Sequence, residues 1–186
     1  MGIVFDREVL GRCAARGLDR PLDEGFAAIT EALLEHYPRH VRPGPPRWIF
    51  NNAGGAMGQL HLLHASLSEY LIFFGSAVGT EGHSGRYATA VSDWMIAGEM
   101  WCQIEGRTER QTYGPGQMAH LERGQTKAYR LPSGGWMLEY ARGPIPQMLP
   151  FGLADSILST LDYSAVGRTL HQYGGLVLRS LLRGKV

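Results

Sequence analysis

The chain has 186 residues, of which 44% are hydrophobic and 19% are charged, a balance typical of globular rather than disordered proteins. This length favours a single domain with a substantial core. The formal net charge of +1 provides no global field that would attract nucleic acid. The two cysteines, Cys13 and Cys102, form neither a disulfide framework nor a zinc-ligand spacing, so we expect them to be core residues.

The N-terminus lacks the pattern of a signal peptide, because four charged residues between Asp6 and Arg12 interrupt its apolar residues. No window approaches the ~18–20 apolar residues that span a bilayer. We therefore expect an intracellular protein that is either cytoplasmic or attached to a membrane surface.

Residues 1–47 are predicted to form two helices. Apolar residues recur at helical spacing between Val9 and Leu18, and Asp6 is placed to cap that helix. A second apolar stripe runs from Phe26 to Tyr37 and ends at Pro38. Packing against a core explains both stripes without any function.

Residues 48–143 contain short apolar runs separated by Gly and Pro turns, which predict a β-sandwich or a closed barrel. Some runs, such as Tyr70–Phe74, are apolar on both faces. Such strands have covering elements outside and a filled or ligand-lined interior. The predicted strands cover residues 60–63, 70–75, 94–104, 117–120, 126–131 and 136–140.

Residues 144–186 return to a helical period. One helix is predicted over 151–161, and Asp162 is placed to cap a second whose stripe runs from Val166 to Leu181. Because basic residues surround this stripe, it predicts a membrane-surface helix, a helix that closes the mouth of the barrel, or both. The three segments together predict one α+β domain, residues 1–186, that is mainly β.

Three patterns that resemble known sites are set aside. His61 and His64 are expected on opposite faces of a strand, without a third ligand, so they do not predict a metal site. Residues 113–120 resemble the second motif of metal cupins, but no His-x-His cluster precedes them. Ser84 lacks the strand–turn–helix setting of a nucleophilic serine.

Carboxylates within apolar strands are the stronger signal. Glu139 lies in Trp136–Tyr140, Asp93 begins an apolar strand, and Glu69 precedes another. A buried carboxylate must be protonated, hydrogen-bonded or matched by a cation, and many such groups are structural. Two carboxyls a few ångströms apart tend to share one proton. Such a pair can bind a lipophilic ammonium, or protonate an alkene and remove a neighbouring proton.

The sequence resembles the family of the sigma receptor and the fungal sterol Δ8–Δ7 isomerases over roughly residues 8–180. The nine-residue run from Leu62 to Tyr70 is the most specific match. The matching motifs are Asn52–Gly55, Leu62–Tyr70, Gly82–Tyr87, Glu139–Gly143, Ile145-Pro146 and Leu153–Asp155.

The resemblance implies a cupin-like β-barrel with an enclosed apolar pocket and two membrane-facing C-terminal helices, commonly in a homotrimer. It implies no metal and no organic cofactor. In the family, residues matching Glu139, Asp93 and Tyr70 are the principal acid or amine-binding group, its partner and a hydrogen-bond donor to the acid. The residue matching Glu69 ties strand ends together. The pocket positions map to Leu60, Leu62, Ile72, Phe74, Tyr87, Val91, Met148, Leu149 and Tyr173.

Three functions follow from these residues. The first is an isomerase that moves a Δ8 double bond to Δ7 in a sterol or sterol-like terpenoid. The second is a non-catalytic receptor for hydrophobic amines, and the third is a proton-initiated isomerase or cyclase of another polyprenoid. Family members often carry Trp where this chain has Ala56 and Leu131, so we expect a roomier or differently shaped pocket. The sequence does not decide which carboxyl gives the proton.

Overall fold

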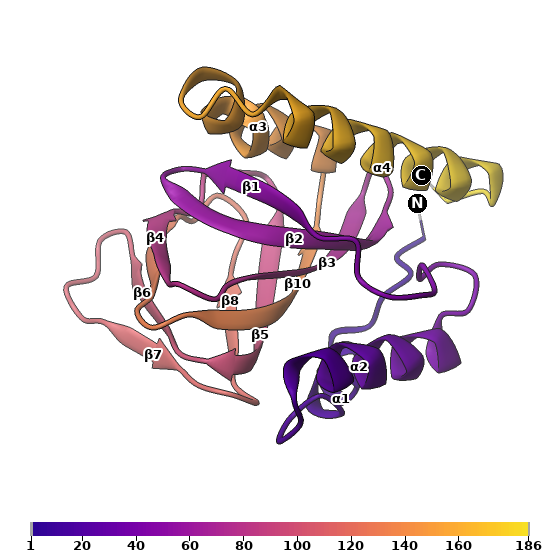
Figure 1. Cartoon of the computed structure of the whole chain (residues 1–186), viewed down its shortest axis with the longest axis horizontal. Helices are drawn as coiled ribbons and strands as arrows, with labels where there is room; N and C mark the ends of the chain where they lie inside the picture. The colour runs from indigo at the N-terminus through magenta and orange to yellow at the C-terminus, as the bar shows by residue number, and fades with distance from the viewer. Residues whose placement is uncertain (1, 186) are drawn as a thin grey trace.

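Helices from both ends of the chain flank two antiparallel sheets. The computed structural model describes residues 2–185. Figure 1 shows α1 (Arg7–Ala15) and α2 (Leu22–His36) on one side of the strands, and α3 (Leu149–Leu158) and α4 (Tyr163–Leu182) across another. The predicted class, a mainly β domain with helices at both ends, is confirmed.

The strands form one six-stranded and one four-stranded sheet. Within residues 2–185 no strand ladder joins them, so they are two sheets rather than one continuously paired barrel. The larger has the order β1-β2-β3-β10-β5-β8, comprising Ile49–Ala53, Ala56–Ala65, Glu69–Ser76, Gly135–Arg142, Ala90–Gly98 and Met118–Leu121. The smaller has the order β4-β9-β6-β7, comprising Thr80–His83, Lys127–Leu131, Met100–Ile104 and Gln111–Tyr113.

Alternation along the strands of the larger sheet divides the core in two. In β3, Leu71 and Phe73 belong to an outer core beneath α1 and α2, whereas Ile72 and Phe74 belong to an inner core between the sheets. A strand with apolar packing on both faces is therefore apolar throughout, as Tyr70–Phe74 predicted. The inner face is the one that can carry a site.

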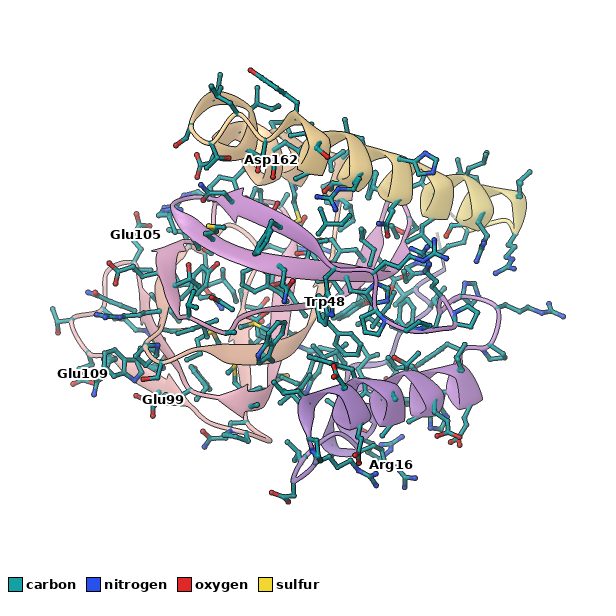
Figure 2. The ribbon with its side chains drawn as sticks, in the orientation of Figure 1. Arg16, Trp48, Glu99, Glu105, Glu109 and Asp162 are labelled. Atoms are coloured by element: carbon teal, nitrogen blue, oxygen red, sulfur yellow. The ribbon has the colours of Figure 1, made fainter. Side chains whose placement is uncertain are left out.

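The N-terminal helices form as predicted and cover the outer core. The Asp6 carboxylate accepts hydrogen bonds from the amides of Glu8 and Val9 and so caps α1. Trp48, labelled in Figure 2, lies between the strands and α2. Its ring packs 5.1 Å from those of Phe26 and Trp136.

The prediction of a single strand over 94–104 is wrong, because the chain turns between β5 and β6. Gly98 adopts a φ of +74°, a conformation that residues with side chains rarely adopt. A Cβ there would lie 2.3 Å from the carbonyl oxygen of Gly134, so the turn requires glycine. The short strands β1, β4 and β7 were not among the predicted strands: the apolar residues of β1 are interrupted by Asn51 and Asn52, β4 has none and β7 has only Tyr113.

The expectation that His61 and His64 lie on opposite faces is also wrong. A bulge between Leu62 and His64 shifts the register, so both rings reach the outer core, where they contact Phe73 and Phe5. Burial lowers the pKa of each histidine to about 4. Residues 2–185 contain no group of three His, Cys, Asp or Glu side chains arranged to hold a metal ion.

The C-terminal helices differ in detail from their prediction. Asp162 caps α4 by accepting the amide of Ala165, as expected (Figure 2). The buried face of α4, however, is formed by Ala165, Tyr173, Leu176 and Ser180. Other residues of the predicted stripe, such as Leu170, are exposed. No helix within residues 2–185 is long and apolar enough to cross a membrane.

Glu69 ties the two ends of the chain to β3. Its carboxylate accepts the amides of Val4 and Phe5 at 2.9 and 3.3 Å and the Tyr140 hydroxyl at 2.6 Å, and it pairs with Lys185 at 2.6 Å. Burial alone would raise the pKa of Glu69, but these hydrogen bonds outweigh burial and lower it. Lys185 also donates to the carbonyl oxygen of Gly2 at 2.8 Å, so the first and last parts of the described chain lie side by side (Figure 1).

We predict that Glu69→Gln lowers the free energy of unfolding by about 3–5 kcal/mol, because it leaves the Lys185 charge buried without its partner. Urea unfolding at neutral pH measures the change. Glu105→Gln is the matched control, since Glu105 forms an ion pair with Arg86 in which both side chains are at least half exposed. The control should change stability by less than about 1 kcal/mol. Equal losses in the two variants would contradict the role given to Glu69.

Candidate functional site

A cavity of about 190 Å³ lies between the two sheets and beneath α3 and α4. Side chains from both sheets and both C-terminal helices line it. All the residues that the resemblance assigned to a site are among its walls, although their roles stay predictions. They are Leu60, Leu62, Tyr70, Ile72, Phe74, Tyr87, Val91, Asp93, Glu139, Met148, Leu149 and Tyr173.

Strand pairing brings the two predicted acids together. Glu139 of β10 is the register partner of Asp93 on β5. Partners in adjacent antiparallel strands project from the same face with their Cβ atoms about 4.5–5.5 Å apart. The flanking residues Leu138 and Tyr140 lie in the outer core, so Glu139 faces the cavity. The sheet therefore sets two carboxyl groups next to each other in an apolar space.

Glu139 has a weak set of partners for a buried acid. The Tyr70 hydroxyl donates a hydrogen bond to its Oε1 atom, and no cation pairs with it among the described residues. Burial and the nearby charge of Asp93 raise the pKa of Glu139 to about 7, although Tyr70 and Lys127 oppose the shift. A carboxyl with this pKa is suited to donate a proton near neutral pH.

Lys127 is a member of the site that the sequence analysis missed. It enters from β9 in the smaller sheet, and its Nζ atom lies 2.5 Å from Oδ2 of Asp93. The two side chains are only 7% and 4% exposed. Burial, the largest single influence, lowers the pKa of Lys127, but the charge of Asp93, its hydrogen bond to Lys127 and the nearby Cys102 and Glu139 together outweigh burial and raise it. Asp93 therefore faces a cation at Oδ2, while its Oδ1 atom has no hydrogen-bond partner among residues 2–185.

Alternation along β9 is the signal that could have revealed Lys127. Lys127, Tyr129 and Leu131 are buried or half-buried, whereas Ala128 and Arg130 between them are exposed. Leu131, the apolar residue that ends this strand, lies four positions after Lys127 and therefore on the same face. Because successive side chains of a strand point to opposite faces, Lys127 is expected to point inward with Leu131.

Aromatic and small residues shape the rest of the cavity. The Tyr129 ring lies 5.8 Å from the Lys127 Nζ atom, and the Phe151 ring of α3 meets Tyr87 edge-on at 5.7 Å. Of the two positions expected to widen the pocket, Ala56 lines the cavity. Leu131 is fully buried and is not among the lining residues. The missing ring at Ala56 is therefore the one that bears on cavity shape.

We predict that Glu139 makes stability depend on pH. Its pKa rises from 4.5 to about 7 on folding, so the folded protein binds this proton more tightly than the unfolded chain. The stabilisation is fully present below pH 4.5 and is lost as the pH rises through 7, a change on the order of 3 kcal/mol. The stability of the wild type relative to Glu139→Gln should therefore decrease from pH 5 to pH 8.

Chemical denaturation at several pH values measures this difference. Glu105→Gln is the control, because an exposed carboxyl should give a nearly constant difference over the same range. A pH-independent difference for Glu139→Gln would show that burial does not perturb this carboxyl.

Comparison with known proteins places these features in a family. The chain is 48% identical to the C-8 sterol isomerase of Neurospora crassa, with 98% of this chain and 73% of that protein covered. It is 40% identical to the C-8 sterol isomerase ERG2 of Gibberella zeae, with 98% of this chain and 79% of that protein covered. It is also 40% identical to the sigma non-opioid intracellular receptor 1 of Danio rerio, with 95% of this chain and 81% of that protein covered.

Solved structures of cupins show partial similarity. An RmlC-like cupin from Shewanella frigidimarina is 16% identical, with a TM-score of 0.47 over 56% of this chain and 90% of that one.

The sequence profile described as ERG2 and Sigma1 receptor like protein matches residues 2–185. The chain belongs to the ERG2 and sigma-1 receptor-like family.

Proposed function

We propose that the protein is an isomerase that moves a ring double bond of a sterol or sterol-like terpenoid from Δ8 to Δ7, without a metal or organic cofactor. The observation that carries the proposal is a carboxyl group, Glu139, whose pKa is raised to about 7 in an apolar cavity beside a second acid. Relatives named C-8 sterol isomerase, 40–48% identical to this chain, support the same reaction.

The proposed reaction needs one proton donor and one acceptor. Protonated Glu139 adds its proton to one alkene carbon, and the other carbon becomes a carbocation. The carboxylates of Glu139 and Asp93 stabilise that charge, and one of them removes a proton from the adjacent carbon to form the new double bond. One proton is gained and one is lost, so the product is an isomer. Apolar walls suppress capture of the carbocation by water.

The cavity must enlarge to admit such a substrate. Its volume of about 190 Å³ is below the ~300–1,000 Å³ typical of ligand pockets. Met148, Leu149 and Tyr173 form part of its wall on the side of α3 and α4. We propose that these helices move apart when the ligand enters.

The outer surface of the same helices fits a membrane. It combines arginines with exposed apolar side chains, a pattern typical of helices that lie on a bilayer. The exposed apolar residues are Ile157, Leu158, Leu161, Tyr163, Leu170, Leu178, Leu181 and Leu182. We propose an intracellular protein bound to a membrane surface, from which an apolar substrate reaches the cavity. The homotrimer implied by the resemblance stays part of this proposal.

A second candidate function is the binding of hydrophobic amines without catalysis. The 40% identity to sigma non-opioid intracellular receptor 1 supports it, and the same acids would serve it. Incorporation of solvent hydrogen separates the two functions, because only the isomerase adds a proton to carbon.

We predict that Glu139→Gln lowers the isomerisation rate by about 10²–10⁴-fold or more, because the amide cannot donate the proton. Conversion of a Δ8 sterol in deuterated water, followed by mass spectrometry, should show one deuterium in the wild-type product. Glu81→Gln alters an exposed carboxyl and should retain full activity. Full activity of Glu139→Gln, or a product without label, would refute the mechanism.

We predict that Leu178→Glu combined with Leu182→Glu reduces the vesicle-bound fraction several-fold, because both side chains are exposed on α4, at 59% and 80%. Sedimentation with vesicles of neutral and anionic lipids measures binding. Val78→Glu, which alters an exposed apolar residue outside α3 and α4, is the matched control and should bind normally. Unchanged binding of the double variant would refute the proposed membrane surface.

A further inference from the structure

Four tyrosines line the cavity, and two of their hydroxyl groups are bound to other parts of the chain. The Tyr70 hydroxyl donates to the carboxylate of Glu139. The Tyr173 hydroxyl donates to the carbonyl oxygen of Ser66 at 3.4 Å. Each of these hydroxyls has therefore already given its one hydrogen to the protein and has none left for a ligand.

The other two tyrosines, Tyr87 and Tyr129, form no hydrogen bond through their hydroxyls with any residue from 2 to 185. The Tyr87 hydroxyl lies against the backbone of Gly85, where an added Cβ would collide with it. Its ring also meets the Phe151 ring of α3 edge-on at 5.7 Å. The chain itself thus covers much of Tyr87, so Tyr129 is the tyrosine whose polar group most needs a partner from outside the protein.

Strand alternation turns the Tyr129 side chain into the cavity. It lies on β9 and shares its face with Lys127. Lys127 is not its partner, because the Nζ atom pairs with Asp93 and lies 5.8 Å from the centre of the Tyr129 ring. Burial, and after it the charge of Glu139, raises the pKa of Tyr129. The hydroxyl therefore keeps its proton and can donate one hydrogen bond as well as accept one.

We propose that Tyr129 is a specificity-determining residue, whose hydroxyl forms a hydrogen bond with a hydroxyl group of the substrate. The ligand class is then a terpenoid alcohol rather than a terpenoid hydrocarbon. The inference deepens the proposed function and rests on its assignment of the cavity as the ligand site.

The argument concerns a polar group enclosed by apolar walls. A buried hydroxyl without a partner is unfavourable, and a ligand that supplies the partner removes that cost. A hydrocarbon ligand would instead exclude water from the Tyr129 hydroxyl without replacing its hydrogen bond. Sites that hydrogen-bond a ligand hydroxyl reject analogues without it more strongly than apolar pockets reject a small change of shape. Tyr129 therefore makes the cavity discriminate between an alcohol and the corresponding hydrocarbon.

The position of Tyr129 also orients the ligand. Glu139 projects from the larger sheet, whereas Tyr129 projects from β9 of the smaller one. The helices lie elsewhere, because α3 packs on β1, and α4 packs on β1 and β2. The hydroxyl end of the ligand is then held at the smaller sheet and its alkene beside Glu139. The apolar remainder extends toward Met148 and Leu149 at the start of α3.

The test compares a hydroxylated Δ8 sterol with the analogue that carries hydrogen in place of the hydroxyl. Competition binding gives the ratio of the two affinities for each protein variant. Tyr129→Phe removes a single oxygen atom, so this ratio should fall about tenfold relative to wild type. The loss should come from weaker binding of the sterol, while the deoxy analogue binds within about twofold of wild type or more tightly.

Tyr113→Phe is the matched control. Tyr113 lies on β7 of the same sheet, is half-buried, and donates its hydroxyl to Gln111 at 3.3 Å. It is not among the residues that line the cavity. Its removal of one hydroxyl should leave the affinity ratio at the wild-type value.

An unchanged ratio in Tyr129→Phe would overturn the inference, as would an equal fall in Tyr113→Phe. A fall in Tyr87→Phe but not in Tyr129→Phe would also overturn it, because the contact would then belong to Tyr87. If Tyr129→Phe does not fold, the wild type decides: it should bind the sterol at least about threefold more tightly than the deoxy analogue, and an equal or reversed preference contradicts the inference. Failure of the isomerase proposal gives a different result: the ratio falls as expected, but the wild type converts no sterol.

Discussion

The structure depends on how three carboxyl groups are accommodated within apolar β-structure. Glu69 is surrounded by two amides, a tyrosine hydroxyl and Lys185. Asp93 is matched by Lys127 at 2.5 Å. Among residues 2–185, Glu139 has only the Tyr70 hydroxyl as a hydrogen-bond partner, and its pKa rises to about 7 as a result of burial and the charge of Asp93. Because burying an unmatched carboxylate is costly, Glu139 is the acid that holds a proton near neutral pH.

Strand alternation keeps the structural and reactive acids apart although the residues that serve them are neighbours in the chain. Tyr140 points outward from β10 and donates to Glu69, whereas Glu139 points inward to the cavity. On β3, Tyr70 likewise points inward and donates to Glu139, whereas Glu69 points outward and accepts the amide of Val4. A shift of one residue in either strand would exchange the two environments. The outer core, with the N-terminal helices packed on it, therefore maintains the register on which the site depends.

Much of this could be predicted from local patterns. Helical periodicity and the capping residues Asp6 and Asp162 predicted the helices, and the family motifs predicted which residues would surround a pocket. The errors came from features that involve distant residues. The bulge near His64 depends on pairing with β3, and the turn at Gly98 on the approach of Gly134. Lys127 reaches Asp93 from the other sheet. The two residues are 34 positions apart in the sequence, so no local pattern predicts their contact.

The most direct test of this account is the titration of Glu139 itself. Carbon-13 NMR of the protein labelled at glutamate carboxyl carbons follows each side chain through its pKa, and Glu139→Gln identifies the signal by its loss. A midpoint near 7, well above those of exposed glutamates, is the result that this account predicts. A midpoint near 4.5, the ordinary value for glutamate, would show that Glu139 is ionised at neutral pH and would contradict its role as the proton donor.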